Sequence, residues 1–217
     1  MSVDFLATAP TKIVCIGSNY RRHIEELGRT IPSEPRIFMK PTSALIGPGD
    51  AIVLPPGTER VDHEAELGVV IGRSMSRVPA SESLAYVAGY TCVNDVTARD
   101  LQKRDVLFTR AKGFDTFCPV GPVVVGDLDP SDLRVQAWVD GVLRQDGQTS
   151  DMIFDVPTLL AYVSNIMTLN PGDILATGTP MGVGPLHPGQ TVTIEVSGIG
   201  RLDNPVIARS DRLGEER

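Results

Sequence analysis

The sequence has no excess of basic residues. Its 217 residues include 20 Lys and Arg against 27 Asp and Glu, which gives a formal net charge of −7. Proteins that bind nucleic acid or an anionic membrane surface carry a basic patch, and this chain has no basic cluster. The composition therefore argues against nucleic acid and against membranes as partners.

Cysteine and long apolar segments are scarce as well. Cys15, Cys92 and Cys118 form no CxxC pair, which argues against a disulfide scaffold and against a cysteine-based zinc site. No uncharged apolar run approaches the roughly 20 residues that a membrane span requires. The opening MSVDFLATAPTK lacks the apolar core of a signal peptide, so we expect a soluble, cytoplasmic protein.

Glycine and proline are spread along the chain and form no linker. The 21 Gly and 17 Pro are typical of many short strands joined by turns. We predict strands at residues 12–16, 36–40, 51–54, 64–71, 89–94, 120–125, 133–139, 173–177 and 191–196. We predict a helix capped by Asn19 and ending at Leu27, a second at 97–105, and a third from residue 150 or 151 to about 165. The sequence thus predicts one strand-rich α+β domain over residues 1–217, with a solvated tail at about 210–217.

The segment DHEAELGVVIG, residues 62–72, ends in an apolar run that predicts an interior strand. Side chains alternate across a strand, so Glu64 and Glu66 project from the same face, about 7 Å apart. The odd neighbour, His63, should face away from them. Two carboxylates at the mouth of an apolar run repel each other and lose solvation. An exposed strand edge, a basic partner or a bound cation would offset this electrostatic cost.

Asp95 adds a third carboxylate, at the end of another apolar strand. Glu64, Glu66 and Asp95 form an all-oxygen set that suits Mg²⁺, with Mn²⁺ or Ca²⁺ as alternatives. Zinc more often recruits His or Cys. A second interpretation stays open at this point: the glutamates lie on a solvated strand edge and Asp95 caps a helix.

His23 and Glu26 are three residues apart, so on a helix they share a face. A carboxylate beside an imidazole orients the ring and stabilises its cation, which suits a general base that activates water. The following segment, GRTIPSEPR, carries two prolines as a hinged lid does. The alternative is a surface helix with an incidental pair. We expect no catalytic role for the other two histidines. His187 should be exposed in a turn, and His63 should be hydrogen-bonded in a strand.

Two further features of the sequence could bind an anionic substrate. Lys112 lies between small residues in an apolar stretch, where its charge could bind a carboxylate or a developing enolate oxygen. It could equally be a surface lysine with a buried stem. The loop TGTPMGVGP, residues 177–185, offers backbone N–H groups that could bind a carboxylate.

Taken together, these segments resemble the fumarylacetoacetate hydrolase family, in the family's order from about Lys12 to Val206. The matching segments are GSNYRRHIEELG, FMKP, DHEAELGVVIG, VNDVTARDLQ, FTRAKGFDTFCPVGP, RQDGQTSDMIFDVP and LATGTPMGVGP. The compact length is similar to that of the short, single-domain members, which include acylpyruvate hydrolases and oxaloacetate decarboxylases. The resemblance implies a mixed, strand-dominated β-roll or sandwich with a few short helices, and a homodimer.

The resemblance also implies roles for individual residues. The implied ligands of Mg²⁺ or Mn²⁺ are Glu64, Glu66 and Asp95. The implied catalytic residues are His23 and Glu26, which activate water from a lid, and Lys112 and Gln102, which contact the substrate or stabilise its oxyanion. The implied substrate-pocket residues are Lys40, Arg99, Thr179 and Gly178. One departure is that close relatives often have Gly-Gln-Trp before the TRAK segment, where this chain has DVLF at residues 105–108.

The implied reaction is metal-dependent hydrolysis of C–C bonds in small 2-oxo acids, which converts acylpyruvates to pyruvate and a carboxylate. A cation chelated by the carboxylate and keto oxygens stabilises the enolate that forms. Oxaloacetate decarboxylation can use the same site, so hydrolase, lyase and isomerase chemistry all follow from the resemblance. The alternatives are an isomerase or decarboxylase of 2-hydroxy-diene-dioates in aromatic catabolism, and a non-catalytic relative that binds metal and 2-oxo acids.

Overall fold

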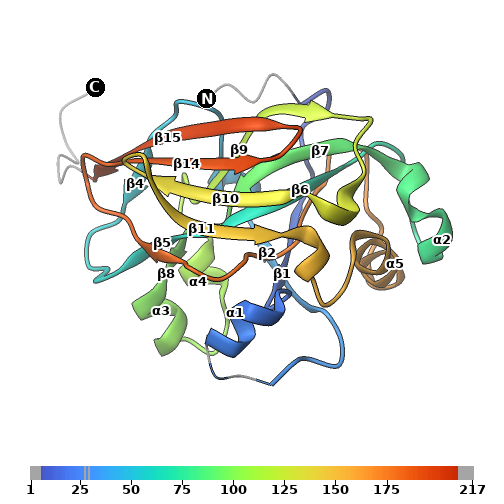
Figure 1. The fold of residues 1–217 in the computed structure, drawn as a ribbon, viewed down its shortest axis with the longest axis horizontal. Coiled ribbons are helices and arrows are strands. Elements are labelled where there is room, and N and C mark those ends of the chain that lie inside the picture. The colour runs from blue at the N-terminus through green and yellow to red at the C-terminus, as the bar shows by residue number, and fades with distance from the viewer. Residues whose placement is uncertain (1–5, 27, 29, 210–217) are drawn as a thin grey trace.

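The structure is a computed structural model that describes residues 6–26, 28 and 30–209 (Figure 1). Within these residues, strands form three sheets, and short helices lie at their edges. This is the strand-dominated α+β fold that the sequence predicts. No helix in the described part of the chain is long and apolar enough to cross a membrane.

The largest sheet has the strand order β2-β1-β12-β6-β7-β9-β3. Its strands are β1 (Ile13–Gly17), β2 (Arg36–Lys40), β3 (Leu45–Ile46), β6 (Ala65–Ile71), β7 (Val87–Asn94), β9 (Cys118–Val125) and β12 (Ile174–Ala176). Strand β6 lies in the middle, antiparallel to both β12 and β7, and all of its residues are buried. Its apolar run follows from this position, because a strand covered on both faces has no solvent side.

A second sheet packs on the first, in the order β11-β10-β14-β15-β4. Its strands are β4 (Ile52–Leu54), β10 (Arg134–Val139), β11 (Val142–Gln148), β14 (Thr191–Val196) and β15 (Gly200–Ala208). Strands β10 and β14 lie against β6 and β7, and Leu67, Val135 and Ile194 share one apolar core. A third, small sheet consists of β13 (Gly184–Pro185), β5 (Val61–His63) and β8 (Thr97–Ala98).

The helices occupy two regions of the molecule. Their bounds are α1 (Arg21–Glu26), α2 (Ala80–Ser83), α3 (Arg99–Arg104), α4 (Thr109–Lys112) and α5 (Val156–Ile166). Short 3₁₀ turns span Thr42–Ala44, Leu84–Tyr86, Pro130–Asp132 and Thr149–Asp151. Helices α1, α3 and α4 gather below the sheets in Figure 1, whereas α2 and α5 lie together at the right of the view. The region of α1, α3 and α4 is where charged side chains converge.

The predicted helix boundaries need correction. The helix predicted at 97–105 begins only at Arg99, because residues 97 and 98 pair with β5. The helix predicted from residue 150 or 151 begins at Val156: residues 149–151 form a 3₁₀ turn, and the side chain of Asp155 accepts a hydrogen bond from the Thr158 N–H as the cap. Asn19 is not a cap, since its side chain bonds to the backbone of Phe154 and Thr177.

All nine predicted strands are present, with ends that differ by no more than two residues. The prediction missed β11 and β15, as well as the short strands β3, β5, β8 and β13. Strand β11 is mostly exposed and polar, and β15 contains Pro205, so neither has the apolar run on which the prediction depended. Leu27 and the predicted tail at 210–217 lie outside the described residues.

Candidate active site and metal centre

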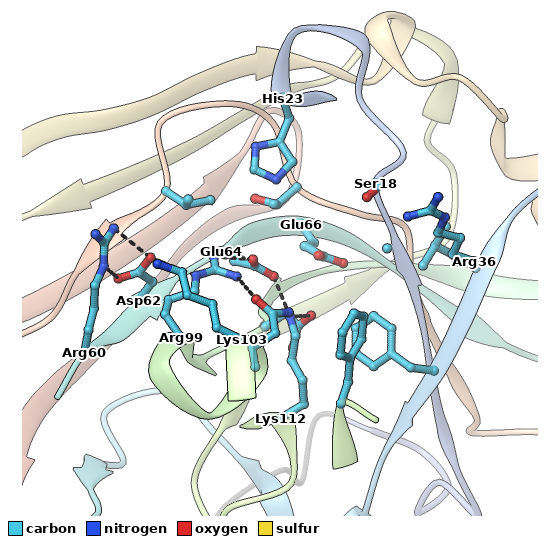
Figure 2. A pocket seen from close by; sticks show the side chains of 18 residues that line it. Ser18, His23, Arg36, Arg60, Asp62, Glu64, Glu66, Arg99, Lys103 and Lys112 are labelled. Carbon is cyan, nitrogen blue, oxygen red and sulfur yellow. Dashed lines mark hydrogen bonds and ion pairs between the residues drawn. The ribbon is translucent and has the colours of Figure 1, made fainter. Parts of the chain in front are cut away.

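A cavity of about 570 Å³ lies where α1, α3 and α4 meet the ends of β1 and β6 (Figure 2). Charged side chains of both signs line it. Among the residues that the sequence singled out, the lining includes His23, Glu64, Glu66, Asp95, Arg99, Gln102, Lys112 and Thr179. Glu26, Lys40 and Gly178 are not part of this lining. The fold thus brings most of the predicted site residues to one place.

The three predicted metal ligands converge at the base of this cavity. Glu66 belongs to β6, Glu64 precedes that strand, and Asp95 follows β7. The antiparallel register pairs Ala65 with Asn94, which places Glu64 beside Asp95, and the Asp95 N–H donates to the Glu64 carbonyl at 2.9 Å. Carboxylate oxygens of the three acids lie within 4.8 Å of one another, and all three residues are buried. Burial rules out the alternative of a solvated strand edge.

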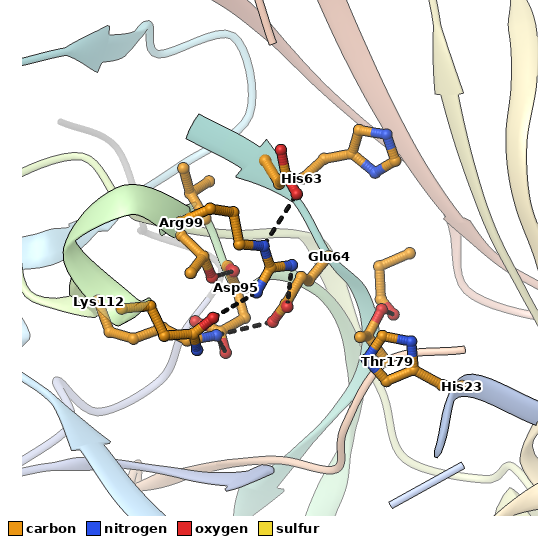
Figure 3. A network of polar contacts seen from close by, with 12 residues as sticks. His23, His63, Glu64, Asp95, Arg99, Lys112 and Thr179 are labelled. Atoms are coloured by element: carbon orange, nitrogen blue, oxygen red, sulfur yellow. Dashed lines mark hydrogen bonds and ion pairs between the residues drawn. The ribbon is translucent and has the colours of Figure 1, made fainter. Parts of the chain in front are cut away.

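Basic side chains surround two of these acids. The Nζ of Lys112 lies 2.7 Å from Oε2 of Glu64 and 2.5 Å from Oδ2 of Asp95. Lys40 Nζ donates to the other Asp95 oxygen, Oδ1, at 2.5 Å, and Arg99 donates to Oε1 of Glu64 (Figure 3). Glu66 instead accepts a hydrogen bond from the backbone N–H of Gly178, at 2.9 Å.

These surroundings shift the pKa values of the two glutamates in opposite directions. Burial alone would raise the pKa of Glu64, but the charges of Arg99 and Lys112 hold that pKa well below its usual value. Burial raises the pKa of Glu66 well above its usual value, and the charges of Asp95 and Glu64 raise it further. Glu66 is therefore the acid whose negative charge the protein's own cations compensate least. A divalent cation would supply the missing positive charge.

The all-oxygen donor set fits a hard divalent cation. Mg²⁺ and Mn²⁺ favour carboxylate oxygens, and a group of three such oxygens in a buried site matches that preference. No His or Cys ligand belongs to this group among the described residues, which argues against a typical zinc site. The residues that could hold the cation are therefore Glu64, Glu66 and Asp95.

His23 faces the carboxylates from α1. In Figure 2 its ring lies on one side of Glu64 and Glu66, and Lys112 approaches from the opposite side. His23 is buried, and its Nδ1 lies 3.3 Å from Oε2 of Glu26. The Glu26 side chain is about one-third exposed and also accepts from the Gly182 N–H at 3.4 Å. The predicted His–Glu pair thus exists. His23 lines the cavity, whereas Glu26 is not part of the lining.

Lys112 is buried among carboxylates and is not a surface lysine. Burial would lower its pKa, but the charges of Asp95 and Glu64 raise that pKa to about 12. Lys112 is therefore a permanent positive charge at neutral pH. Its ammonium also lies 4.9 Å from the ring centre of Phe38, which contacts the ring of Phe108 edge-on.

The structure changes the expectation for two predicted substrate-pocket residues. Lys40 lies behind Asp95, where it also donates to the Val96 carbonyl, so it supports a proposed ligand and does not face the cavity. The Gly178 N–H is occupied by Glu66 and is not free for a substrate carboxylate. Gly178 has φ +99°, and a Cβ there would lie 2.8 Å from the Asn19 Cβ, so glycine suits this position.

The other predicted pocket residues, Arg99 and Thr179, line the cavity, and each is held by hydrogen bonds. Arg99 donates to Asp62, Glu64 and the Oε1 of Gln102. The Thr179 hydroxyl donates to the Ala65 carbonyl. The predicted orientation of His63 is confirmed, since Figure 3 shows its ring turned away from the Glu64 carboxylate. His187 is exposed, as expected.

The sequence interpretation missed several members of the site. Asp62 is buried and accepts hydrogen bonds from Arg60 and Arg99. Its place directly before the His63–Glu66 stretch was an available signal. Gln145 is buried too and bonds to His63 and Thr179, but nothing in the polar run RQDGQ marks it.

The family model described as Fumarylacetoacetate (FAA) hydrolase C-terminal matches residues 12–207. The chain belongs to the fumarylacetoacetate hydrolase family. The resemblance found in the sequence is therefore confirmed over nearly the whole chain.

Several relatives in this family carry functional names, among them two that are similar to this chain over most of its length. An oxaloacetate tautomerase of Arabidopsis thaliana is 44% identical over 205 residues, which cover 92% of this chain and 92% of the relative. An oxaloacetate decarboxylase of Dictyostelium discoideum is 44% identical over 195 residues, which cover 87% of this chain and 89% of the relative. Both names refer to a small 2-oxo acid.

Solved structures of family members have the same fold. A 2-hydroxyhepta-2,4-diene-1,7-dioate isomerase from Mycobacterium marinum matches with a TM-score of 0.87 and 46% identity, covering 93% of this chain and 76% of that one. A fumarylpyruvate hydrolase from Pseudomonas aeruginosa, in complex with Mn²⁺ and pyruvate, matches with a TM-score of 0.87 and 30% identity. That match covers 92% of this chain and 91% of the other. Isomerase and hydrolase are thus both represented among its structural relatives.

Proposed function

We propose that this chain is a divalent-metal-dependent enzyme that hydrolyses C–C bonds in small 2-oxo acids, converting acylpyruvates to pyruvate and a carboxylate. We propose that the same site decarboxylates oxaloacetate. The observation that carries the proposal is the group of three buried carboxylates within 4.8 Å of one another, in a cavity that His23 also lines. The Mn²⁺ and pyruvate complex of the fumarylpyruvate hydrolase supports it.

Glu64, Glu66 and Asp95 are the proposed ligands of Mg²⁺ or Mn²⁺. The chemistry that the cation supplies when bound is Lewis-acid stabilisation of negative charge on the substrate oxygens. Lys40 holds Asp95 in place from behind, and Gly178 does the same for Glu66. Lys112 adds a permanent positive charge beside Glu64 and Asp95, which favours an anionic 2-oxo acid and its enolate.

His23 is the proposed general base for hydrolysis. Its Nδ1 is paired with Glu26, so Nε2 is the atom available to take a proton from water. The Glu26 carboxylate fixes the ring and stabilises the imidazolium that forms. The water oxygen then adds to the distal carbonyl of the acylpyruvate. The C–C bond breaks, its electron pair stays on the pyruvate enolate, and protonation of that enolate gives pyruvate.

Decarboxylation of oxaloacetate needs fewer catalytic groups than hydrolysis of an acylpyruvate. The bond to the distal carboxylate breaks, CO₂ leaves, and the same pyruvate enolate remains. No water attacks, so His23 is not required as a base for this reaction. The names of the oxaloacetate tautomerase and decarboxylase relatives support oxaloacetate as a ligand of this site.

Isomerisation of a 2-hydroxy-diene-dioate is the second candidate function. The isomerase from Mycobacterium marinum favours it, because at 46% its identity to this chain exceeds the 30% of the fumarylpyruvate hydrolase. Such an isomerisation moves a proton through an enolate of the same kind.

The direct test is to measure turnover of acetylpyruvate, oxaloacetate and a hydroxymuconate-like diacid with Mg²⁺ under one set of conditions. We expect acetylpyruvate hydrolysis and oxaloacetate loss, both abolished by removal of the metal. Turnover of the diacid alone would assign the isomerase function. Tight binding of oxalate without turnover of any of the three would show a binding protein.

A further inference from the structure

We propose that Gln145 is a positioning residue of the metal centre, an inference that rests on the proposed function. Gln145 lies in β11 of the second sheet and is fully buried. Its Oε1 accepts from Nδ1 of His63 and from the N–H of Ala65, each at 2.9 Å. Its Nε2 donates to Oγ1 of Thr179 and to the carbonyl of Pro180, each at 2.8 Å. One amide therefore makes four bonds to the wall of the site.

The two bonds to Oε1 bracket Glu64. His63 and Ala65 are its neighbours in the chain, so Gln145 fixes the polypeptide on both sides of this proposed ligand. The orientation of the amide is set by its partners, because the Ala65 N–H can only donate and the Pro180 carbonyl can only accept. His63 must then carry its proton on Nδ1, which holds its ring on the side away from Glu64 (Figure 3).

The two bonds from Nε2 hold the loop that follows β12. Thr179 and Pro180 belong to this loop, and so does Gly178, whose N–H binds the Glu66 carboxylate. The Thr179 hydroxyl also donates to the Ala65 carbonyl, which is a further bond between the loop and β6. Gln145 therefore ties the segment that carries Glu64 to the loop that orients Glu66.

The contact between β11 and this loop leaves little room for adjustment. A Cβ added to Gly147 would lie 2.5 Å from the Cβ of Pro180, so the loop packs directly on the strand. Among the residues of β11, all of which the structure describes, Gln145 is the buried one. A buried amide is costly unless its polar atoms are bonded, and here all of its donor and acceptor groups have partners. An apolar side chain would leave the Ala65 N–H and the Pro180 carbonyl without theirs.

The experiment compares two buried amides of the second sheet. Gln145→Met keeps the approximate size of the side chain and removes all four bonds. The matched control is Asn204→Leu, because Asn204 is buried in β15, donates to the carbonyls of Gly47 and Asp50, and does not line the cavity. Both substitutions should lower the melting temperature. The decisive quantity is the Kd for Mn²⁺ of the full chain, measured by electron paramagnetic resonance of free Mn²⁺ at a temperature where each variant is folded.

We expect Gln145→Met to raise the Kd for Mn²⁺ about 10- to 100-fold, as loss of a group that orients metal ligands commonly does. Asn204→Leu should leave the Kd within about twofold of the wild-type value, because the Asn204 side chain bonds to neither the proposed ligands nor their neighbours in the chain. Gln145→Glu keeps acceptors for His63 and Ala65 and should give an intermediate Kd. If Gln145→Met does not fold, Gln145→Glu decides: a clear rise in Kd supports the inference, and an unchanged Kd overturns it.

A folded Gln145→Met variant with the wild-type Kd would overturn the inference, as would an equal rise for Asn204→Leu. These results are separate from failure of the proposed function. Wild-type chain that binds no Mn²⁺ contradicts both. Wild-type chain that binds Mn²⁺ but turns over no 2-oxo acid contradicts the proposed function alone, and the comparison of the two amides still decides the role of Gln145.

Discussion

Glu64 and Glu66 are two residues apart in the chain but have different electrostatic surroundings. Lys112 and Arg99 contact Glu64, whereas Glu66 receives one backbone N–H. An uncompensated buried carboxylate destabilises a fold, and removal of one partner from a buried ion pair does so too. The two glutamates should therefore respond in opposite ways to neutralisation.

For the metal-free chain, we expect Glu66→Gln to raise the free energy of unfolding by about 1–3 kcal/mol, because it removes an uncompensated charge. Glu64→Gln should lower it by about 3–5 kcal/mol, because it leaves Lys112 and Arg99 short of a partner. Denaturant unfolding of chelator-treated protein measures both values. If both substitutions destabilise the metal-free chain equally, the proposed asymmetry is wrong.

His23 permits a second test with a single residue, because the two proposed reactions differ in their need for water. We expect His23→Ala to slow acetylpyruvate hydrolysis about 10²- to 10⁴-fold, the usual contribution of a general base. Oxaloacetate decarboxylation should change little, since it breaks a bond without attack by water. Steady-state rates with both substrates measure this difference. Equal loss of both activities would contradict the assigned role.

The pairing of β6 with β7 explains how much of the site could be predicted from sequence. The apolar runs marked both strands, and alternation along the strand placed Glu64 and Glu66 together while His63 faced away. That Asp95 joins them depends on the register of the pair, which a sequence pattern alone does not specify. The resemblance to the family supplied that link.

Elements without an apolar pattern were missed or misplaced. The strand β11 is held by pairing with β10 and by the single buried amide of Gln145, so its sequence looks like a polar loop. The role of Gly178 was misjudged for a related reason. Its N–H was expected to be free, but tertiary folding places Glu66 against it.

The start of β12 provides a test of stability against pH. Asp173 is fully buried and accepts from the backbone N–H groups of Thr11, Lys12 and Asn170 and from Lys12 Nζ. Burial would raise its pKa, but these donors together hold the pKa below its usual value. A carboxylate with a depressed pKa stabilises the fold above its unfolded pKa of about 3.9, and that contribution is lost as the pH falls through the folded pKa.

We therefore expect Asp173→Asn to lower the free energy of unfolding by about 1–3 kcal/mol at pH 7. The difference in the free energy of unfolding between wild type and variant should stay constant down to about pH 5 and become smaller below about pH 4. Denaturant unfolding across this pH range measures it. A difference that grows as the solution becomes more acidic would contradict the assigned hydrogen bonds.

At the scale of the whole molecule, the two large sheets share one apolar core that contains residues from β6, β7, β10 and β14. The predicted single domain of residues 1–217 should therefore unfold in one cooperative transition. The proposed ligands lie on β6 and beside β7, in the middle of the larger sheet, so a bound cation should stabilise that whole unit.

Calorimetry of the full chain tests this coupling. At a free Mn²⁺ concentration of about 100 times its Kd, we expect the single transition to gain about 2.7 kcal/mol of stability. Glu66→Gln should lose most of this gain. Two transitions, of which Mn²⁺ shifts only one, would show that the chain does not unfold as one domain.

The expected homodimer and the cytoplasmic location remain predictions. Sedimentation at varied protein concentration would test the homodimer.

The proposed function depends on one divalent cation, held by Glu64, Glu66 and Asp95 at the base of the cavity. A crystal structure of the protein grown with Mn²⁺ and oxalate tests it most directly. We expect an anomalous difference peak at the manganese edge, with one oxygen of each carboxylate within roughly 2.0–2.3 Å of the ion. We also expect oxalate bound to the cation, on the side that His23 faces. Crystals with oxalate in the cavity but no anomalous peak among the three carboxylates would show that these residues do not hold a cation.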